Sequence, residues 1–348
     1  LWLQAGNLEG AERCAYQAAT LLAKESRWQD SLEMLERVID FARMRSQVHK
    51  VSELLLLAGN VLKQSGDTVS AERAYLELIA ALESRPTEKS LGIVYNQLAD
   101  LYKMRSDFEA GLAALRKALP IYEQLGYELE YSRTCNNLGN MYWVIGDLRK
   151  SAQQYRRALR LQRKLNAQTD IATSLSNLGG ILCMIGKIKR GLFLMNTSLK
   201  IKRELGNAGE IARTLNNLGY VSYITGENVR AVEYLNESLE LNRRTGSRKE
   251  ILINIENLTS IMISAGQLGE SLSLLQEGLD LSRKLEDQSH EVLFCAGMAD
   301  AFVRLGRLGE AYGLLADTER FLTEVDDRGV TVLHCLASAQ YHAAIDSL

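Results

Sequence analysis

Apolar residues recur three and four positions apart along almost the whole chain, as they do on the buried face of an amphipathic helix. The pattern predicts one helix from about Glu130 to Ile145 and a second from about Leu148 to Leu165. The side chains expected to be buried are Cys135, Leu138 and Tyr142 in the first helix, and Ala152, Tyr155, Ala158 and Leu159 in the second.

This pattern of two helices repeats every 40 residues, with no insertion or deletion over eight copies. The turn residues of the copies are Ser26, Gly66, Ser106, Gly146, Gly186, Gly226, Gly266 and Gly306. A second set of turn residues lies twenty positions away, at Gly6, Ser46, Pro86, Gly126, Asn166, Gly206, Gly246, Glu286 and Asp326. Each 40-residue unit therefore has two breaks and two helices, and we expect it to form a helical hairpin.

Two further columns of the repeat hold small residues. Five positions after the turns stand Ser31, Ala71, Gly111, Ser151, Gly191, Ala231, Ser271 and Ala311. Seven positions before them stand Ala19, Gly59, Ala99, Gly139, Gly179, Gly219, Thr259 and Ala299. Small side chains let two backbones approach closely. Since a lone hairpin cannot bury its apolar stripe, stability must come from stacking each unit on its neighbours, which gives a solenoid with an extended concave face.

The residues of the fourth unit resemble the tetratricopeptide repeat (TPR). The resemblance rests on residues 135–142 (CNNLGNMY), followed by Gly146-Asp147, Ser151, Tyr155 and Ala158-Leu159. The 40-residue period is longer than the usual 34 and is similar to the long-helix TPRs of kinesin light chains and LGN/Pins adaptors. The resemblance implies an all-α, right-handed α-solenoid (superhelix) of about eight TPR helical hairpins plus one extra C-terminal helix.

We expect residues 1–348 to form a single TPR solenoid, with residues 331–348 as the first helix of a truncated ninth repeat. The chain is expected to be a fragment of a larger protein. Residues 5–13 (AGNLEGAER), leading to residues 31–37 (SLEMLER), resemble the start of the TPR region that follows the ATPase module in bacterial STAND-type regulators. That resemblance implies a sensing array whose partners include its own flanking ATPase or output domain.

A row of amide side chains follows the first helices. In TPR proteins, by resemblance, the residues nine and six places before each turn face the concave groove, together with those two, three and thirteen places before it. Nine places before the turn stand Gln97, Asn137, Asn177, Asn217 and Asn257. Six places before it stand Asn60, Asp100 and Asn140, and ten places before it, beside this face, stand Asn96, Asn136 and Asn216.

Two interpretations of this amide ladder remain open. A carboxamide offers donors and an acceptor, so it can bind a peptide backbone without requiring a particular sequence. The same amides can instead bond within the array and set the helix spacing, because buried polar groups need partners.

Large apolar side chains join the same face near the centre, where they suit a peptide or helix groove or, alternatively, packing between repeats. They are Trp143, Val144, Cys183, Met184, Tyr220, Tyr223 and Ile224. The residues predicted to bind a partner are Gln97, Asp100, Asn137, Asn140, Trp143, Asn177, Met184, Asn217, Tyr220, Tyr223 and Asn257.

Charge is unevenly distributed. The formal net charge is −2, but thirteen Lys or Arg stand against the single acid Asp170 between Arg149 and Arg203. We define the basic ridge as Arg156, Arg157, Arg160, Arg163, Lys164, Lys187, Lys189 and Arg190, extended by Lys200, Lys202 and Arg203, all expected on the outer face. Such a ridge can dock an acidic partner, an anionic surface or nucleic acid, or simply be solvated. A pI of about 6.2 argues against a dedicated nucleic-acid binder.

The amino-acid composition agrees with the all-α class of protein that the repeat predicts. The chain is 46% hydrophobic and 24% charged, with only two prolines, which fits a globular helical protein better than a turn-rich β protein. No apolar run approaches the length of about eighteen residues that a membrane span requires. Five cysteines without a CxxC motif favour a reducing, cytoplasmic compartment.

The sequence shows no convergent set of catalytic residues, and we predict no enzymatic activity, metal or cofactor. His334 and Cys335 are neighbours, but adjacent helical residues point about 100 degrees apart and cannot easily share a metal. The predicted function is a protein-protein interaction scaffold or sensor that binds a peptide or protein in its concave groove, as the regulatory arm of a larger signalling or transcription-regulatory protein. Two alternatives are a eukaryotic adaptor of the LGN or kinesin-light-chain kind, and acidic-partner or nucleic-acid binding through residues 149–203.

Overall fold

The computed structural model describes residues 28–44, 48–82, 89–319 and 328–346, together with Gly10, Cys14, Gln17, Ala18 and Leu21. The helices found in these residues number sixteen, and no strand occurs among them. The chain forms two compact units, Leu1–Ser174 and Leu175–Leu348, which are described separately below.

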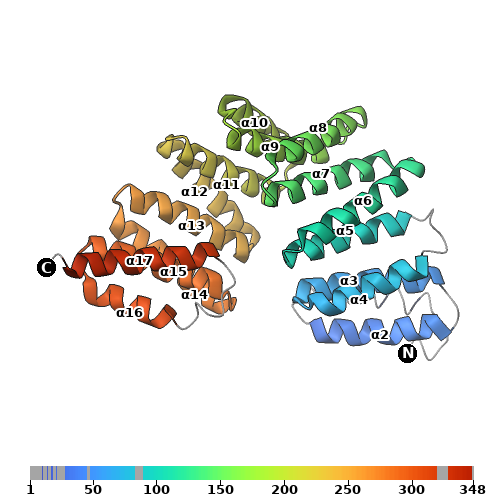
Figure 1. Cartoon of the computed structure of the whole chain (residues 1–348), viewed down its shortest axis with the longest axis horizontal. Helices are drawn as coiled ribbons and strands as arrows, with labels where there is room; N and C mark the ends of the chain where they lie inside the picture. The colour runs from blue at the N-terminus through green and yellow to red at the C-terminus, as the bar shows by residue number, and fades with distance from the viewer. Residues whose placement is uncertain are drawn as a thin grey trace. The chain divides into compact units, whose positions relative to one another are not determined.

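The first unit contains α2 (Trp28–Met44), α3 (Val48–Ser65), α4 (Thr68–Leu82), α5 (Lys89–Met104), α6 (Phe108–Gln124), α7 (Glu128–Val144), α8 (Leu148–Lys164) and the start of α9 (Gln168–Met184) (Figure 1). The second unit contains the rest of α9, then α10 (Ile188–Leu205), α11 (Ala208–Ile224), α12 (Asn228–Thr245), α13 (Arg248–Ser264), α14 (Leu268–Lys284), α15 (Gln288–Arg304), α16 (Leu308–Glu319) and α17 (Arg328–Asp346) (Figure 1).

Within each unit the helices pack in chain order. The hairpins α3–α4, α5–α6, α7–α8 and α11–α12 form from helices joined by short turns, and successive hairpins also contact each other where α4 packs on α5, α6 on α7 and α12 on α13. α17 packs on α15 and α16, in the place of the first helix of a further repeat. The predicted fold class, an all-α solenoid of repeated helical hairpins, is confirmed.

The turns lie where the repeat predicts them. Glycine tolerates a left-handed backbone because it has no Cβ. The residues with positive φ are Gly66, Ser106, Gly126, Gly146, Asn166, Gly186, Gly206, Gly226, Gly246, Gly266, Glu286 and Gly306. The predicted turns at 6, 26, 46, 86 and 326, and most of the segment 5–13, lie outside the described residues. Every described turn residue of both sets therefore has the left-handed backbone that glycine, and less often a polar residue, adopts at the end of a helix.

The small columns bring two helices of a hairpin into close contact. A Cβ atom added to Gly191 on α10 would lie 2.5 Å from the carbonyl oxygen of Gly179 on α9 and would collide with the Sγ of Cys183. The expectation that small residues allow close approach of two backbones is confirmed at this crossing.

The hairpin of the fourth unit matches its prediction except at one side chain. Cys135 and Leu138 are buried on α7, as are Ala152, Tyr155, Ala158 and Leu159 on α8. The expectation that Tyr142 is buried was wrong: Tyr142 is only partly buried, its hydroxyl accepts a hydrogen bond from Arg116, and the Lys150 ammonium lies 5.5 Å from its ring centroid. Met141, at 2% exposure, fills the core instead because its methyl group packs against the small Gly111.

A polar layer is buried between second helices and the first helices that follow them. Gln162 accepts a hydrogen bond from Ser174 at 2.6 Å, and Asn242 donates to Asn254 at 2.5 Å. Lys202 contacts both Glu210 and Thr214 at 2.9 Å. These pairs stand at equivalent positions of three consecutive repeats.

Lys202 was expected on the outer basic ridge, and this was wrong, because it is only 5% exposed and forms an ion pair with Glu210. Burial lowers the pKa of the Lys202 ammonium by more than Glu210 raises it. Burial raises the pKa of the Glu210 carboxyl, but Lys202 and Arg213 outweigh this effect and hold it below its usual value. The ion pair is therefore part of the core of the second unit.

Candidate partner-binding site

A cavity of about 250 Å³ lies in the first unit between α5, α6 and α7. It is lined by Asn96, Gln97, Ala99, Asp100, Lys103, Leu115, Asn137, Asn140 and Met141. Four of the predicted site residues thus meet in one place, because the 40-residue period repeats their position on consecutive first helices. Leu115 and Met141 are buried and supply an apolar floor beneath the amides.

Lys63 on α3 orients one side of this cavity. Its Nζ donates to Gln97 Oε1 at 2.7 Å and to Asp100 Oδ2 at 2.8 Å. Lys103 Nζ lies 3.0 Å from the other oxygen of Asp100. Burial raises the pKa of the Asp100 carboxyl, but the two lysines outweigh burial and hold it below its usual value. With its oxygen occupied, Gln97 keeps an amide NH₂ that has no partner among the described residues.

The other side of the cavity is an amide relay. Asn137 donates to Asn96 Oδ1 at 2.8 Å, and Asn96 in turn donates to Thr134 Oγ1 at 3.0 Å. The Oδ1 of Asn137 has no hydrogen-bond partner in the described part of the chain. Asn140 Oδ1 accepts from the Tyr155 hydroxyl at 2.6 Å. The cavity therefore carries an unused donor on Gln97 and an unused acceptor on Asn137.

Amide side chains in the two neighbouring columns form different hydrogen bonds. Ten places before the turn, Asn136 donates to Ser174 at 2.7 Å and Asn216 accepts from Asn254 at 2.8 Å, so this column bonds inside the array. Nine places before the turn, Asn137 and Asn257 each use only the amide nitrogen to reach an asparagine of that inner column. Asn137 and Asn257 thus each link two first helices through the amide nitrogen.

The remaining predicted site residues do not line this cavity. Trp143 on α7 is 47% exposed, and in the second unit Met184 is 55% and Tyr220 53% exposed. Tyr223 is half-buried, and its hydroxyl lies 3.1 Å from Ser264 Oγ. Asn177 lies on α9, Asn217 is exposed on α11 and Asn257 lies on α13. Their binding roles stay predictions.

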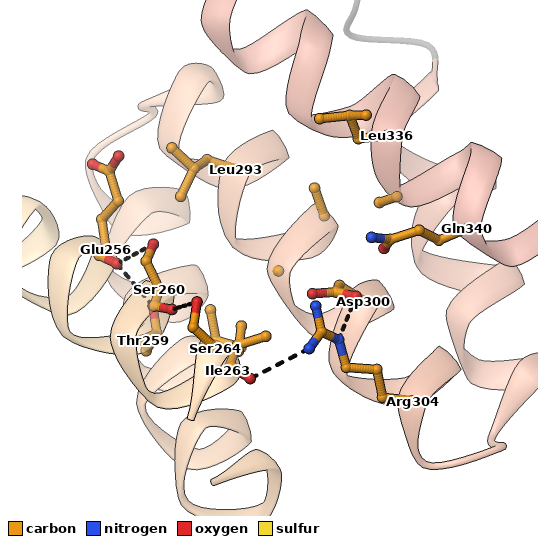
Figure 2. A pocket seen from close by; sticks show the side chains of 14 residues that line it. Glu256, Thr259, Ser260, Ile263, Ser264, Leu293, Asp300, Arg304, Leu336 and Gln340 are labelled. Carbon is orange, nitrogen blue, oxygen red and sulfur yellow. Dashed lines mark hydrogen bonds and ion pairs between the residues drawn. The ribbon is translucent and has the colours of Figure 1, made fainter. Parts of the chain in front are cut away.

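A second cavity has a volume of about 250 Å³ and was not predicted from the sequence. Figure 2 shows the side chains that line it. It lies in the second unit between α13, α14, α15 and α17. Arg304 Nε donates to Asp300 Oδ1 at 2.9 Å, and the Gln340 amide points toward this pair (Figure 2). Leu293 and Leu336 supply apolar walls.

The sequence does hold a signal for this cavity, because polar residues stand at groove-facing positions before the turns at Gly266 and Gly306. Six places before these turns are Ser260 and Asp300, and two places before them are Ser264 and Arg304. The cavity was missed because the amide ladder ends at Asn257, and Gly297 stands at the ladder position of the next repeat.

Apart from the buried Lys202, the basic ridge is exposed in both units. In the first unit Arg156, Arg157, Arg160, Arg163 and Lys164 lie on α8, and in the second Lys187 precedes α10 while Lys189 and Arg190 lie on it. Lys164 pairs with Glu128 at 2.7 Å, and the Arg157 guanidinium lies 4.8 Å from the ring centroid of Tyr131. Exposure of these residues agrees with the predicted outer face.

Reactive side chains are not assembled into a centre in the described residues. No group of three or more His, Cys, Asp or Glu side chains there is placed to hold a metal ion. Burial raises the pKa of the Cys135 thiol to about 11 and that of Cys295 to about 12, so both stay protonated at neutral pH. His334 is buried whereas Cys335 is exposed. None of the described helices combines the length and the apolar character needed to cross a membrane.

Stacked helical hairpins, with a polar cavity on the first helices, define a helical-repeat protein. Residues 90–164 and 170–244 match the family model of the tetratricopeptide repeat, and these parts of the chain are tetratricopeptide repeats, as the sequence resemblance implied. This repeat is a protein-interaction fold. No curated protein sequence matches the chain.

Solved structures share the fold at low sequence identity. A Rap protein complexed with competence and sporulation factor matches with a TM-score of 0.60 and 15% identity, over 98% of this chain and 100% of that one. The Rap conjugation gene regulator of plasmid pLS20, in complex with a Phr peptide, gives 0.60 and 13%, over 91% and 98%. A STAND protein with a tetratricopeptide repeat sensor from Pyrococcus horikoshii gives 0.61 and 15%, over 90% of this chain and 49% of that one.

Proposed function

We propose that this chain is a partner-binding module that takes an extended peptide segment onto its first helices and serves as the sensing arm of a larger regulatory protein. The unused NH₂ of Gln97 and the unused Oδ1 of Asn137 in one cavity carry this proposal. A peptide unit offers a carbonyl to the first and an N–H to the second, so the cavity recognises main chain rather than a particular side chain. The module has no reaction of its own and works in the cytoplasm.

Two kinds of likeness support the proposal. The Rap neighbours are described in complex with competence and sporulation factor and with a Phr peptide, so this architecture accommodates peptides. The STAND neighbour carries its repeats as a sensor, and this chain corresponds to about half of that protein. A flanking ATPase or output domain is therefore proposed as the element that the array regulates.

The experiment is a selection of a phage-displayed random 12-residue peptide library on the chain, followed by affinity measurement of the selected peptides by fluorescence anisotropy. The double substitution Gln97→Ala and Asn137→Ala is expected to weaken binding about tenfold, because two hydrogen bonds of roughly 0.5–1.5 kcal/mol each are lost. Since both side chains are only partly buried and belong to no hydrophobic core, the helical circular dichroism should be unchanged.

The matched control is Gln153→Ala with Asn236→Ala, which removes one exposed glutamine and one exposed asparagine from the second helices α8 and α12. This control should leave peptide affinity within twofold of the original. Equal affinity of both double variants would reject the cavity as the binding place, and a selection that yields no binding peptide would reject the proposed function.

A further inference from the structure

Ion pairs connect successive second helices in a regular way. A basic residue near the end of one second helix pairs with an acid 34 positions later, on the next second helix. These pairs are Arg43–Glu77, Arg203–Glu237 at 2.6 Å and Arg243–Glu277 at 2.6 Å. The repeated geometry shows that these two positions of the 40-residue unit face each other when the first carries an arginine and the second, 34 positions later, a glutamate.

The corresponding positions in the middle of the first unit carry the charges in reverse order. Glu123 on α6 stands where the arginines stand, and Arg157 on α8 stands where the glutamates stand. They do not form an ion pair; both line a cavity of about 350 Å³ between α6, α7 and α8. A cavity is therefore open at the position where, in other repeats, an ion pair joins two successive second helices.

Both arginines of this cavity are available to a ligand. The Arg157 guanidinium lies over Tyr131, 4.8 Å from the ring centroid, and neither Arg157 nor Arg160 has an acidic partner among the described residues. Stacking on an aromatic face holds the planar guanidinium in place and leaves its N–H edge free, and Arg160 follows one helical turn later. All seven charged residues of α8 are basic, which adds a positive field.

We propose that this second-helix cavity binds an acidic side chain of a partner protein, with the carboxylate held by Arg157 and Arg160. A guanidinium fork matches a carboxylate in two parallel hydrogen bonds. Glu123 and Glu128 on the facing wall can accept a neighbouring main-chain N–H of the partner, a donor that the sugar-phosphate backbone of single-stranded DNA lacks. An acidic protein segment, whose carboxylates alternate with main-chain donors, fits both walls.

This site goes beyond the proposed function, since its cavity shares no lining residue with the one that holds Gln97 and Asn137. Its test therefore has an outcome of its own. The probe is a fluorescein-labelled decaglutamate peptide, titrated with the full chain at 150 mM salt and followed by anisotropy. A 20-nucleotide oligothymidylate is the competing polyanion.

The double variant Arg157→Gln with Arg160→Gln is expected to weaken decaglutamate binding at least tenfold. The control Arg156→Gln with Arg163→Gln removes the same charge from the same helix, outside the cavity, and should weaken binding less than threefold. Equal losses of decaglutamate affinity in the two double variants would show that the peptide is held only by the overall positive charge of α8. This result would overturn the proposal. Absence of decaglutamate binding, or tighter binding of oligothymidylate, would also overturn it.

A charge exchange tests the same site from the opposite direction. Glu123→Arg combined with Arg157→Glu restores the order found at Arg43–Glu77 and should close the cavity with an ion pair. Decaglutamate binding is then expected to be lost while helical content is retained, because the restored pair occurs naturally elsewhere in the array. Retained binding in this folded variant would contradict the proposed role of Arg157.

Discussion

Replacement of Gly191 by alanine is expected to destabilise the second unit by about 2–3 kcal/mol, since added atoms in a close-packed contact force backbone shifts. The new Cβ would lie 2.5 Å from the Gly179 carbonyl oxygen and 3.0 Å from the Cys183 amide nitrogen. Both of these atoms belong to the backbone of α9, so a rotamer change cannot relieve the clash. Urea unfolding followed by circular dichroism at 222 nm should show an earlier transition.

Gly180→Ala is the matched control, because Gly180 lies on α9, the helix that Gly191 contacts, and no atom approaches its added Cβ within 4 Å. Alanine is favoured over glycine in a helix by up to about 1 kcal/mol, so this variant should unfold at a higher urea concentration. The two Gly→Ala changes are thus expected to have opposite signs. Similar transitions for both variants would contradict the close crossing of α9 and α10.

The fold was predictable from the sequence because its determinants repeat. One small residue has many explanations, but small residues at a fixed place in every copy predict a close helix crossing, and Gly179 with Gly191 form one. The turns follow the same logic, as a left-handed residue stands at each described break. Repetition converts weak local preferences into a specific architecture.

The candidate site was only partly predictable. Asn96 and Asn137 carry the same amide in adjacent columns of the repeat, yet Asn96 is an internal link and Asn137 has an unused acceptor. Which side chain bonds inward depends on the neighbouring helix, where Thr134 meets Asn96. The sequence shows which side chains are amides. Only the packing of the helices decides which amide bonds within the array and which keeps an unused atom.

Lys202 shows how a local charge count misleads. It stands among basic residues that are exposed, but its equivalents in other repeats include Ala42, Leu82 and Tyr122, all of which are buried. Alignment of the repeats, rather than the sum of charges from 149 to 203, held the correct signal. Burial at this position is set by the repeat, and the sequence then supplies Glu210 and Thr214 to satisfy the ammonium.

The substitution Glu210→Gln is expected to destabilise the second unit by about 2 kcal/mol at pH 7, because it leaves a buried ammonium without its counter-charge. Lys202→Met should cost less, roughly 1 kcal/mol or below, since it removes the buried charge and leaves Glu210 paired with Arg213 at 2.6 Å. Chemical unfolding of both variants at pH 7 measures this asymmetry. A larger loss for Lys202→Met would contradict it.

The pH dependence gives the same pair a sharper test. The folded-state pKa of Glu210 is depressed, so its contribution is present above the unfolded value near 4.5 and is lost as pH falls through the lower folded-state value. Lys202 also has a depressed pKa, so its burial costs stability until the pH rises through that folded-state value toward 10.5. The stability difference between the original chain and Glu210→Gln should therefore be largest near neutral pH and narrow at both extremes. A difference that is constant from pH 4 to pH 10 would show that the charge on Glu210 does not stabilise the buried ammonium.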